Sequence, residues 1–192
     1  MIFSDRQIRR ALANGRVVID PAPADDQFAP SAVDLTVGSE FKAWKHAPPG
    51  AVEPVRLTEV NFPDYADMLA DLPVEADGGV VIQPGQFVLS ATAERVELPN
   101  DSRLAARVEG RSSYARLGLV VHMTAPTIHA GFSGSIVLEM MNFGPFPLKF
   151  DPGRTRICQL IFEELGDDPA CALDTVFLDQ ADVAGSKQHG RP

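Results

Sequence analysis

Short apolar runs separated by Pro and Gly turns are the feature that most constrains the fold. The runs and turns follow one another at 80–82, Pro84-Gly85, 87–91, 95–98 and Pro99-Asn100. Frequent short strands with such turns are typical of all-β proteins, whereas a βαβ array would place helices between its strands. The sequence therefore predicts a mainly β sandwich, barrel or jelly roll.

One helix and several further strands complete this pattern. Ser4 and Gln7 have the spacing of a capping box, and Gly15 ends the apolar face that begins at Ile8, so a short helix opens the chain. Further strands are predicted at 17–19, 32–37, 135–141, 147–150 and 156–162. We expect loops at 22–30 and 124–134, and an irregular insertion at 45–73 with a helical turn at 65–69.

The segment from Gly110 to Arg116 concentrates polar chemistry. Arg111 and Arg116 supply guanidinium forks, Ser112 and Ser113 supply hydroxyl donors, and Gly110 lets backbone N–H groups approach a ligand. An oligophosphate fits this set of donors. Two interpretations stay open from the residues alone. In the second, the arginines are surface charges paired with Glu109 or Glu94, and the serines cap a helical turn.

Glu139 lies inside the predicted strand 135–141. Alternation places Ile136, Leu138 and Met140 on one face and Glu139, with Val137, on the other. A carboxylate beside apolar side chains is suited to proton transfer. The alternative is a solvated Glu on a half-exposed strand, which antiparallel sheets carry routinely.

Composition limits the class of protein. The chain has 192 residues, which fit one domain over 1–192, and its net charge of −9 argues against a nucleic-acid partner while leaving a single nucleotide compatible. Cys158 and Cys171 lack metal-type spacing, and we expect both to be buried thiols in a reducing compartment. No signal-like or membrane-length apolar run is present, so a cytoplasmic protein is predicted.

Several motifs occur together in a fixed order. They are Gly110–Leu119, His122–Ala125, Gly131–Glu139, Pro152-Gly153 and Ile157–Leu160, with weaker matches at 4–8, 31–35, 84–87 and 185–187. In order and spacing they resemble the dCTP deaminase branch of the dUTPase-like superfamily. The resemblance implies a distorted jelly-roll or β-barrel, a homotrimer with sites between subunits, and a C-terminal tail at 181–192 that folds over the nucleotide. Lys187 would contact phosphate.

The resemblance also implies a reaction, the hydrolytic deamination of dCTP to dUTP in pyrimidine deoxynucleotide synthesis. Glu139 would take a proton from water as it attacks C4 of cytosine and pass that proton to the leaving ammonia. Ser112 and the backbone near Ala125 would position the water, and the Val137 backbone would read the pyrimidine edge. The enzyme would be a hydrolase that cleaves a cyclic amidine C–N bond.

The family pattern assigns the triphosphate to the polar segment. Arg111, Ser112, Ser113 and Arg116 would hold it, with Arg116 also near the reacting centre, and Mg²⁺ would bridge the phosphate oxygens. The zinc deaminase signatures, H-x-E and P-C-x-x-C, do not occur, so no zinc is expected. The family links the His122 position to dTTP, a candidate feedback inhibitor.

Two positions depart from the family pattern. His129 stands where an Asp commonly contacts the deoxyribose, and no Tyr follows Tyr114, although the family tail usually carries one. Four hypotheses stay open: a dUTP-releasing deaminase, a bifunctional deaminase and dUTP diphosphatase that gives dUMP, a non-catalytic nucleotide-binding regulator, and an enzyme for a modified cytosine nucleotide. The first is preferred because Glu139 is present, whereas His129 weakens water activation for the second.

Overall fold

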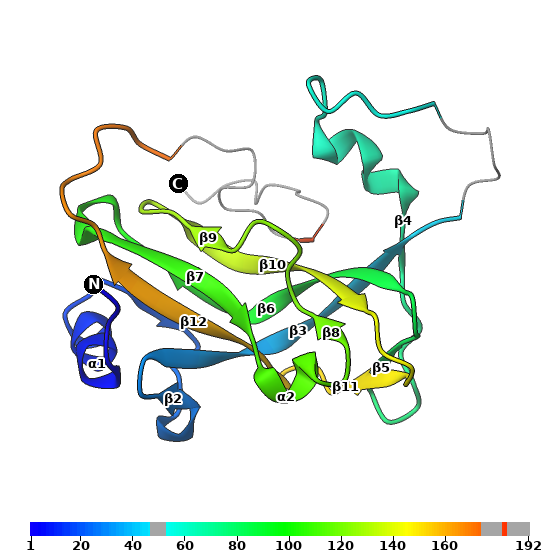
Figure 1. The fold of residues 1–192 in the computed structure, drawn as a ribbon, viewed down its shortest axis with the longest axis horizontal. Helices are drawn as coiled ribbons and strands as arrows, with labels where there is room; N and C mark the ends of the chain where they lie inside the picture. The colour runs from blue at the N-terminus through cyan, green and yellow to red at the C-terminus, as the bar shows by residue number, and fades with distance from the viewer. Residues whose placement is uncertain (47–52, 174–181, 184–192) are drawn as a thin grey trace.

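A computed structural model describes residues 1–46, 53–173 and 182–183, and it is built on antiparallel sheets (Figure 1). The strands are β1 (Val18–Asp20), β2 (Phe28–Ala29), β3 (Ala32–Trp44), β4 (Leu69–Asp71), β5 (Val80–Ile82), β6 (Phe87–Glu97), β7 (Leu104–Gly110), β8 (Leu119–Val120), β9 (Thr127–Ile128), β10 (Ser133–Asn142), β11 (Leu148–Phe150) and β12 (Arg156–Glu164). The helices are α1 (Asp5–Ala13), α2 (Ser112–Ala115) and the 3-10 turns η1 (Asp25–Gln27), η2 (Phe62–Met68) and η3 (Asn100–Ser102).

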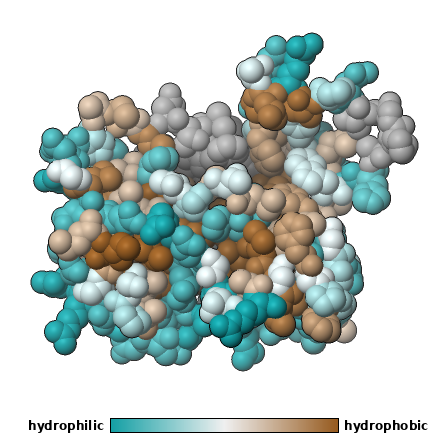
Figure 2. Space-filling view, in the orientation of Figure 1, coloured by the Kyte–Doolittle hydropathy of each residue, from teal (hydrophilic) through white to brown (hydrophobic). Residues whose placement is uncertain are grey.

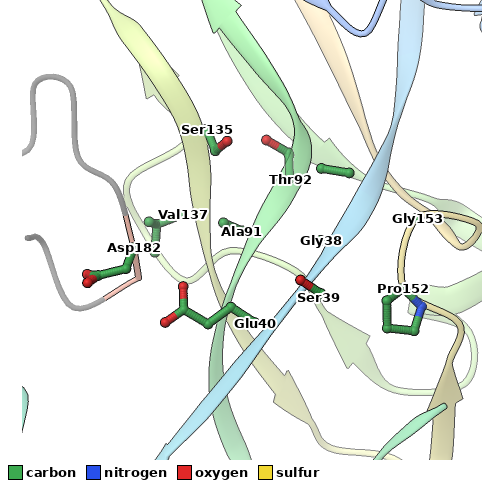
Figure 3. Close-up of a pocket in the computed structure, with 11 residues that line it drawn as sticks. Gly38, Ser39, Glu40, Ala91, Thr92, Ser135, Val137, Pro152, Gly153 and Asp182 are labelled. Carbon is green, nitrogen blue, oxygen red and sulfur yellow. The ribbon is translucent and has the colours of Figure 1, made fainter. Parts of the chain in front are cut away.

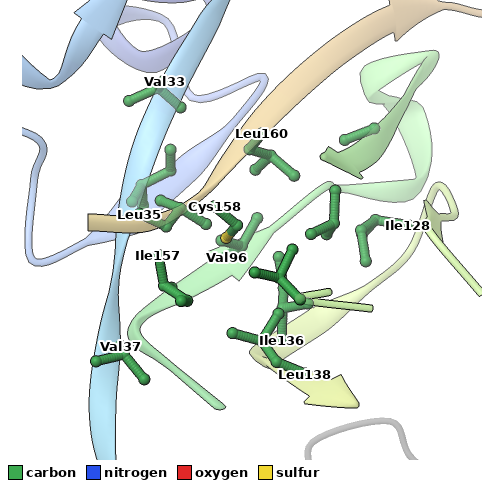
Figure 4. Close-up of a cluster of buried hydrophobic side chains, with 14 of the residues drawn as sticks. Val33, Leu35, Val37, Val96, Ile128, Ile136, Leu138, Ile157, Cys158 and Leu160 are labelled. Carbon is green, nitrogen blue, oxygen red and sulfur yellow. The ribbon is translucent and has the colours of Figure 1, made fainter. Parts of the chain in front are cut away.

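The main sheet curls around a large apolar core, and a second, smaller buried cluster forms around Leu69, Leu89 and Val183. Its strand order is β8-β10-β6-β3-β12-β7-β9, while β1, β2 and β4 pair at its margins and β5 pairs with β11 in a small second sheet. The curvature brings β3, β6, β9, β10 and β12 to the same buried cluster (Figure 4). The mainly β fold class predicted from the sequence is therefore confirmed.

The N-terminal helix confirms the predicted capping box. The backbone N–H of Ser4 donates to Oε1 of Gln7 at 3.0 Å, and α1 buries Ile8 and Ala11 against the core. Gly15, at φ +74°, directly follows the C-cap, where the left-handed conformation favours glycine.

Several predicted boundaries are wrong. The runs 87–91 and 95–98 form one strand, β6, because Thr92 and Glu94 between them are buried and hydrogen-bonded rather than in a turn. The insertion 45–73 contains β4 and a longer turn than expected, η2. The predicted loop 22–30 contains η1 and β2, and the predicted loop 124–134 contains β9.

The surface mixes polar and apolar side chains, with an apolar group where η2 meets β4 (Figure 2). None of the helices in the described ranges is long and apolar enough to cross a membrane.

Candidate active site

Glu139 lies where β10 faces away from the core. As predicted, Ile136, Leu138 and Met140 are buried on the core side, whereas Glu139 and Val137 are half-buried on the other side. Glu139 is directly opposite Leu89 of β6 in the ladder. The strand register therefore fixes the carboxylate at a defined point on the outer face of the sheet.

This carboxylate lines an apolar cavity of about 380 Å³, here called the Glu139 pocket. Its aromatic walls come from Trp44, Phe62, Phe87 and Phe132. Leu89, Ala125, Ile128, Ile136, Val137 and Val183 complete it. Three residues predicted for the site, Ala125, Val137 and Glu139, are thus brought together. None of the described residues that line the pocket is basic, so it suits a flat, largely apolar ring rather than a phosphate.

The polar segment 110–116 occupies a different place. Arg111 precedes α2 and forms an ion pair with Asp34 of β3, whose other carboxylate oxygen accepts a hydrogen bond from Gln159 Nε2 at 3.1 Å. Ser112, Ser113 and Arg116 are exposed. These three side chains are therefore accessible to a ligand.

This arrangement corrects the surface-charge interpretation. Glu109 contacts Arg107 at 3.4 Å rather than Arg111, and Glu94 accepts hydrogen bonds from the backbone and hydroxyl of Thr36. The residue at the N-cap of α2 is Arg111, and no side-chain cap bond is formed there, so the serines do not cap a turn. Arg111 nevertheless has a structural partner, Asp34, which sequence reasoning missed.

The segment after α2 packs against the end of β10. The backbone N–H of Phe143 donates to the Gly118 carbonyl at 2.9 Å, and a Cβ on Gly144 would lie 1.8 Å from the Leu117 carbonyl oxygen. The polar segment 110–116 and the strand that carries Glu139 are therefore joined through direct backbone contact between the segments that follow them. Yet none of the described residues that form the Glu139 pocket belongs to α2. The part of this pocket that the structure describes therefore contains none of the candidate phosphate-binding residues.

His129 lines a separate cavity of about 310 Å³ together with Cys171. Ile128, the preceding residue in β9, faces the Glu139 pocket instead. The expectation that both cysteines are buried is wrong for Cys171, which is exposed, and right for Cys158. Lys187 lies outside the described residues. His122, the candidate regulatory position, has a buried Nδ1 without a hydrogen-bond partner among the described residues.

A second, more polar cavity of about 430 Å³ adjoins the first and shares Val137 with it (Figure 3). Glu40 and Asp182 contribute carboxylates to its wall. Glu40 accepts a hydrogen bond from the Val183 backbone N–H at 3.1 Å and contacts Lys42 Nζ at 3.3 Å. The hydrogen bond to Asp71, followed by the contact with Glu40, raises the pKa of Lys42. Lys42 thus contacts the carboxylates of Glu40 and Asp71, and it is not among the described residues that line the Glu139 pocket.

Among the described residues, no group of three or more His, Cys, Asp or Glu side chains is placed to hold a metal ion.

Sequence reasoning also missed the aromatic wall of the Glu139 pocket. Trp44 directly precedes the segment 45–73 interpreted as an irregular insertion, and Phe62 lies within it. Their rings meet at 75° with centroids 6.1 Å apart. The available signal was that Trp44 is the only tryptophan in the sequence and stands directly before that insertion.

Comparisons with known proteins identify the family of this chain. Residues 2–165 match the family model described as dCTP deaminase-like. A Methanosphaera stadtmanae protein named "dCTP deaminase, dUMP-forming" is 42% identical over 85% of this chain and 79% of its own length. A Rhodospirillum rubrum protein named "dCTP deaminase" is 42% identical over 86% of this chain and 83% of its own.

A solved structure supports the fold. The crystal structure of 2'-deoxycytidine 5'-triphosphate deaminase from Agrobacterium tumefaciens aligns with a TM-score of 0.63 and 24% identity over 85% of this chain. This chain spans about half of that longer one, 48% of its length. With a family model that covers most of the sequence and relatives above 40% identity, the chain belongs to the dCTP deaminase-like family.

Proposed function

We propose that this chain, a single domain over 1–192, acts in the cytoplasm as a dCTP deaminase that converts dCTP and water to dUTP and ammonia. The observation that carries the proposal is the placement of Glu139 as the one ionisable side chain among the described residues of an aromatic pocket. Such a pocket accommodates a pyrimidine ring and keeps bulk water away from the reacting carbon.

Glu139 is the general base and then the general acid. Its carboxylate removes a proton from water as the oxygen attacks C4 of cytosine, and it returns a proton to the amino group, which leaves as ammonia. Ala125 and Val137 both lie at the pocket wall. The backbone near Ala125 helps to position the water, and the Val137 backbone reads the polar edge of the base. This mechanism uses one carboxylate and no zinc.

The polar segment holds the triphosphate. Arg116, Ser112 and Ser113 are exposed around α2 and are free to meet phosphate oxygens, while Arg111 donates to phosphate from a position fixed by Asp34. Mg²⁺ would be bound by the phosphates themselves, which matches its preference for phosphate and water ligands. Lys187 would add a further phosphate contact, and His129 would contact the sugar.

A homotrimer completes the site. Because the described wall of the Glu139 pocket includes no residue of α2, we place the phosphate-binding segment of a neighbouring subunit beside Glu139. Ser112 of that neighbour would then orient the attacking water and Arg116 would approach the reacting centre. Mixing the inactive variants Glu139→Gln and Arg116→Ala should restore activity, because some mixed sites contain both native residues. If mixing restores nothing, the site lies within one chain.

The alternative is a bifunctional enzyme that also hydrolyses dUTP to dUMP. It is favoured by the relatives, which at about 40% identity include proteins named as dUMP-forming and proteins that are not. His129 weighs against it, because an imidazole offers one acceptor at most where the family pattern has the Asp that orients the hydrolytic water. A non-catalytic nucleotide-binding regulator stays as the third hypothesis. For the deaminase itself, dTTP is a candidate feedback inhibitor.

The product distinguishes these functions. Purified protein is incubated with dCTP and Mg²⁺, and the nucleotides and pyrophosphate are separated by ion-exchange chromatography, with CTP and dUTP as parallel substrates. Accumulation of dUTP supports the proposal, and dUMP with pyrophosphate supports the bifunctional alternative. If dCTP binds and no product forms, the deaminase proposal is wrong.

A further inference from the structure

Trp44 and Glu139 lie on β3 and β10, the two strands that flank β6. Leu89 of β6 is paired with Glu139 on one side and with Lys42 of β3 on the other. Two interstrand spacings, roughly 10 Å, therefore separate the backbones of β10 and β3 at this level. Trp44 follows Lys42 by two residues and so projects from the same face of the sheet. Both Trp44 and Glu139 line the Glu139 pocket, whose volume is about 380 Å³.

The indole is held in place although it is 40% exposed. Its backbone belongs to the β3–β4 ladder, in which Trp44 is opposite Leu69, and the next residue continues the pairing through a hydrogen bond from Lys45 N–H to the Met68 carbonyl at 2.8 Å. The ring of Phe62 meets it at an interplanar angle of 75°. A fixed, partly exposed aromatic surface in a pocket is a preorganised stacking platform.

Among the described residues, no basic side chain lines this wall of the pocket, which favours the base of a nucleotide there over its phosphates. Lys42, the nearest cation on β3, contacts Glu40 and Asp71 and does not line the Glu139 pocket. The pocket thus offers stacking surface on one side and a single carboxylate on the other, which matches a heteroaromatic ring with a polar edge.

We propose that Trp44, braced by Phe62, is a specificity-determining residue that stacks on the pyrimidine base while Glu139 acts on its C4 edge. The inference rests on the proposed function, since it assigns the base to the Glu139 pocket. It adds a contact from β3, outside the polar segment and β10. Alanine substitutions at base-stacking aromatics weaken binding by about 5- to 150-fold, and a comparable loss is expected on removal of the indole.

Because Trp44 is the only tryptophan, its fluorescence reports on this wall alone. The titration uses Glu139→Gln, so that dCTP is not consumed, with binding measured independently by calorimetry. We expect dCTP to quench Trp44 emission and inorganic triphosphate to leave it unchanged. Free N-acetyltryptophanamide at the same nucleotide concentrations corrects for absorption by cytosine. If dCTP binds by calorimetry without quenching, Trp44 does not contact the base.

Steady-state kinetics give a second readout on the otherwise native chain. Trp44→Leu should raise KM for dCTP by about 5- to 150-fold with little change in kcat, and Trp44→Phe, which keeps an aromatic ring, should restore most of the affinity. Phe146→Leu, an exposed aromatic outside the pocket, is the matched control. An unchanged KM in Trp44→Leu would overturn this inference and leave the deaminase proposal standing, whereas absence of dCTP binding by the native chain would overturn both.

Discussion

The ion pair between Arg111 and Asp34 allows a quantitative prediction about the polar segment. The Asp34 side chain is 9% exposed, and it accepts hydrogen bonds from both Arg111 and Gln159. Removing one partner of a fully buried pair costs about 3–5 kcal/mol, since the remaining charge is stranded. Arg111 is 30% exposed, so solvent screens part of the interaction, and we expect Asp34→Ala or Arg111→Ala to cost about 2–3 kcal/mol.

A double-mutant cycle isolates the interaction. Urea unfolding of the native protein, both single variants and the double variant, at one fixed subunit concentration, should give a coupling free energy of about 2 kcal/mol. The matched control is the exposed pair Arg9–Asp25, whose nitrogen and oxygen are 2.6 Å apart but whose Asp25 side chain is 94% exposed. Its coupling should stay below about 1 kcal/mol. If both cycles give the same coupling, the structural role of Arg111 is refuted.

This prediction changes how the phosphate role should be tested. Arg111→Ala combines loss of a phosphate donor with loss of stability, so weaker nucleotide binding by that variant is ambiguous. Arg116 is exposed, and its substitution does not strand Asp34. Arg116→Ala is therefore the cleaner variant for the triphosphate contact.

Two further predictions concern stability. Burial, followed by the nearby charges of Glu94 and Asp34, raises the pKa of the Cys158 thiol well above its ordinary 9.0, so the unfolded chain loses this proton at lower pH than the folded chain. The contribution of Cys158 to the free energy of unfolding is complete below pH 9.0 and falls above it by up to about 1.4 kcal/mol per pH unit. Urea unfolding should show this dependence on pH in the native chain and not in Cys158→Ala. Equal slopes in the two proteins would contradict the prediction. Gly144→Ala should destabilise the fold by about 3 kcal/mol or more in the same assay, because the new Cβ would lie 1.8 Å from the Leu117 carbonyl oxygen. Gly166→Ala, where no atom lies within 4 Å, should be nearly neutral, and equal effects of the two substitutions would show that the close approach is relieved without cost.

Local patterns explain what the sequence predicted correctly. The Ser4–Gln7 spacing and Gly15 define the N-terminal helix within a single stretch of chain. Alternation in 135–141 assigns Glu139 to the outer face, because side-chain direction in a strand depends only on position. The mainly β class follows from the same short-range signals.

Long-range pairing explains what sequence reasoning missed. Asp34 and Arg111 are 77 residues apart, and nothing near either residue indicates its partner. Thr92 and Glu94 interrupt the apolar pattern of β6, yet Thr92 Oγ1 donates to the Glu94 carbonyl at 2.7 Å and Glu94 binds Thr36, so the strand continues through a satisfied polar pair. Trp44 enters the Glu139 pocket only because β4 returns to pair with the end of β3.

The central claim is that Glu139 transfers the protons of the deamination. The direct measurement is ammonia release from dCTP by Glu139→Gln, with dCTP binding measured on the same preparation and Glu97→Gln, on the neighbouring strand β6, as the matched control. The account predicts that Glu139→Gln still binds dCTP and releases no ammonia, while Glu97→Gln turns over like the native protein. Appreciable ammonia release by Glu139→Gln would contradict it.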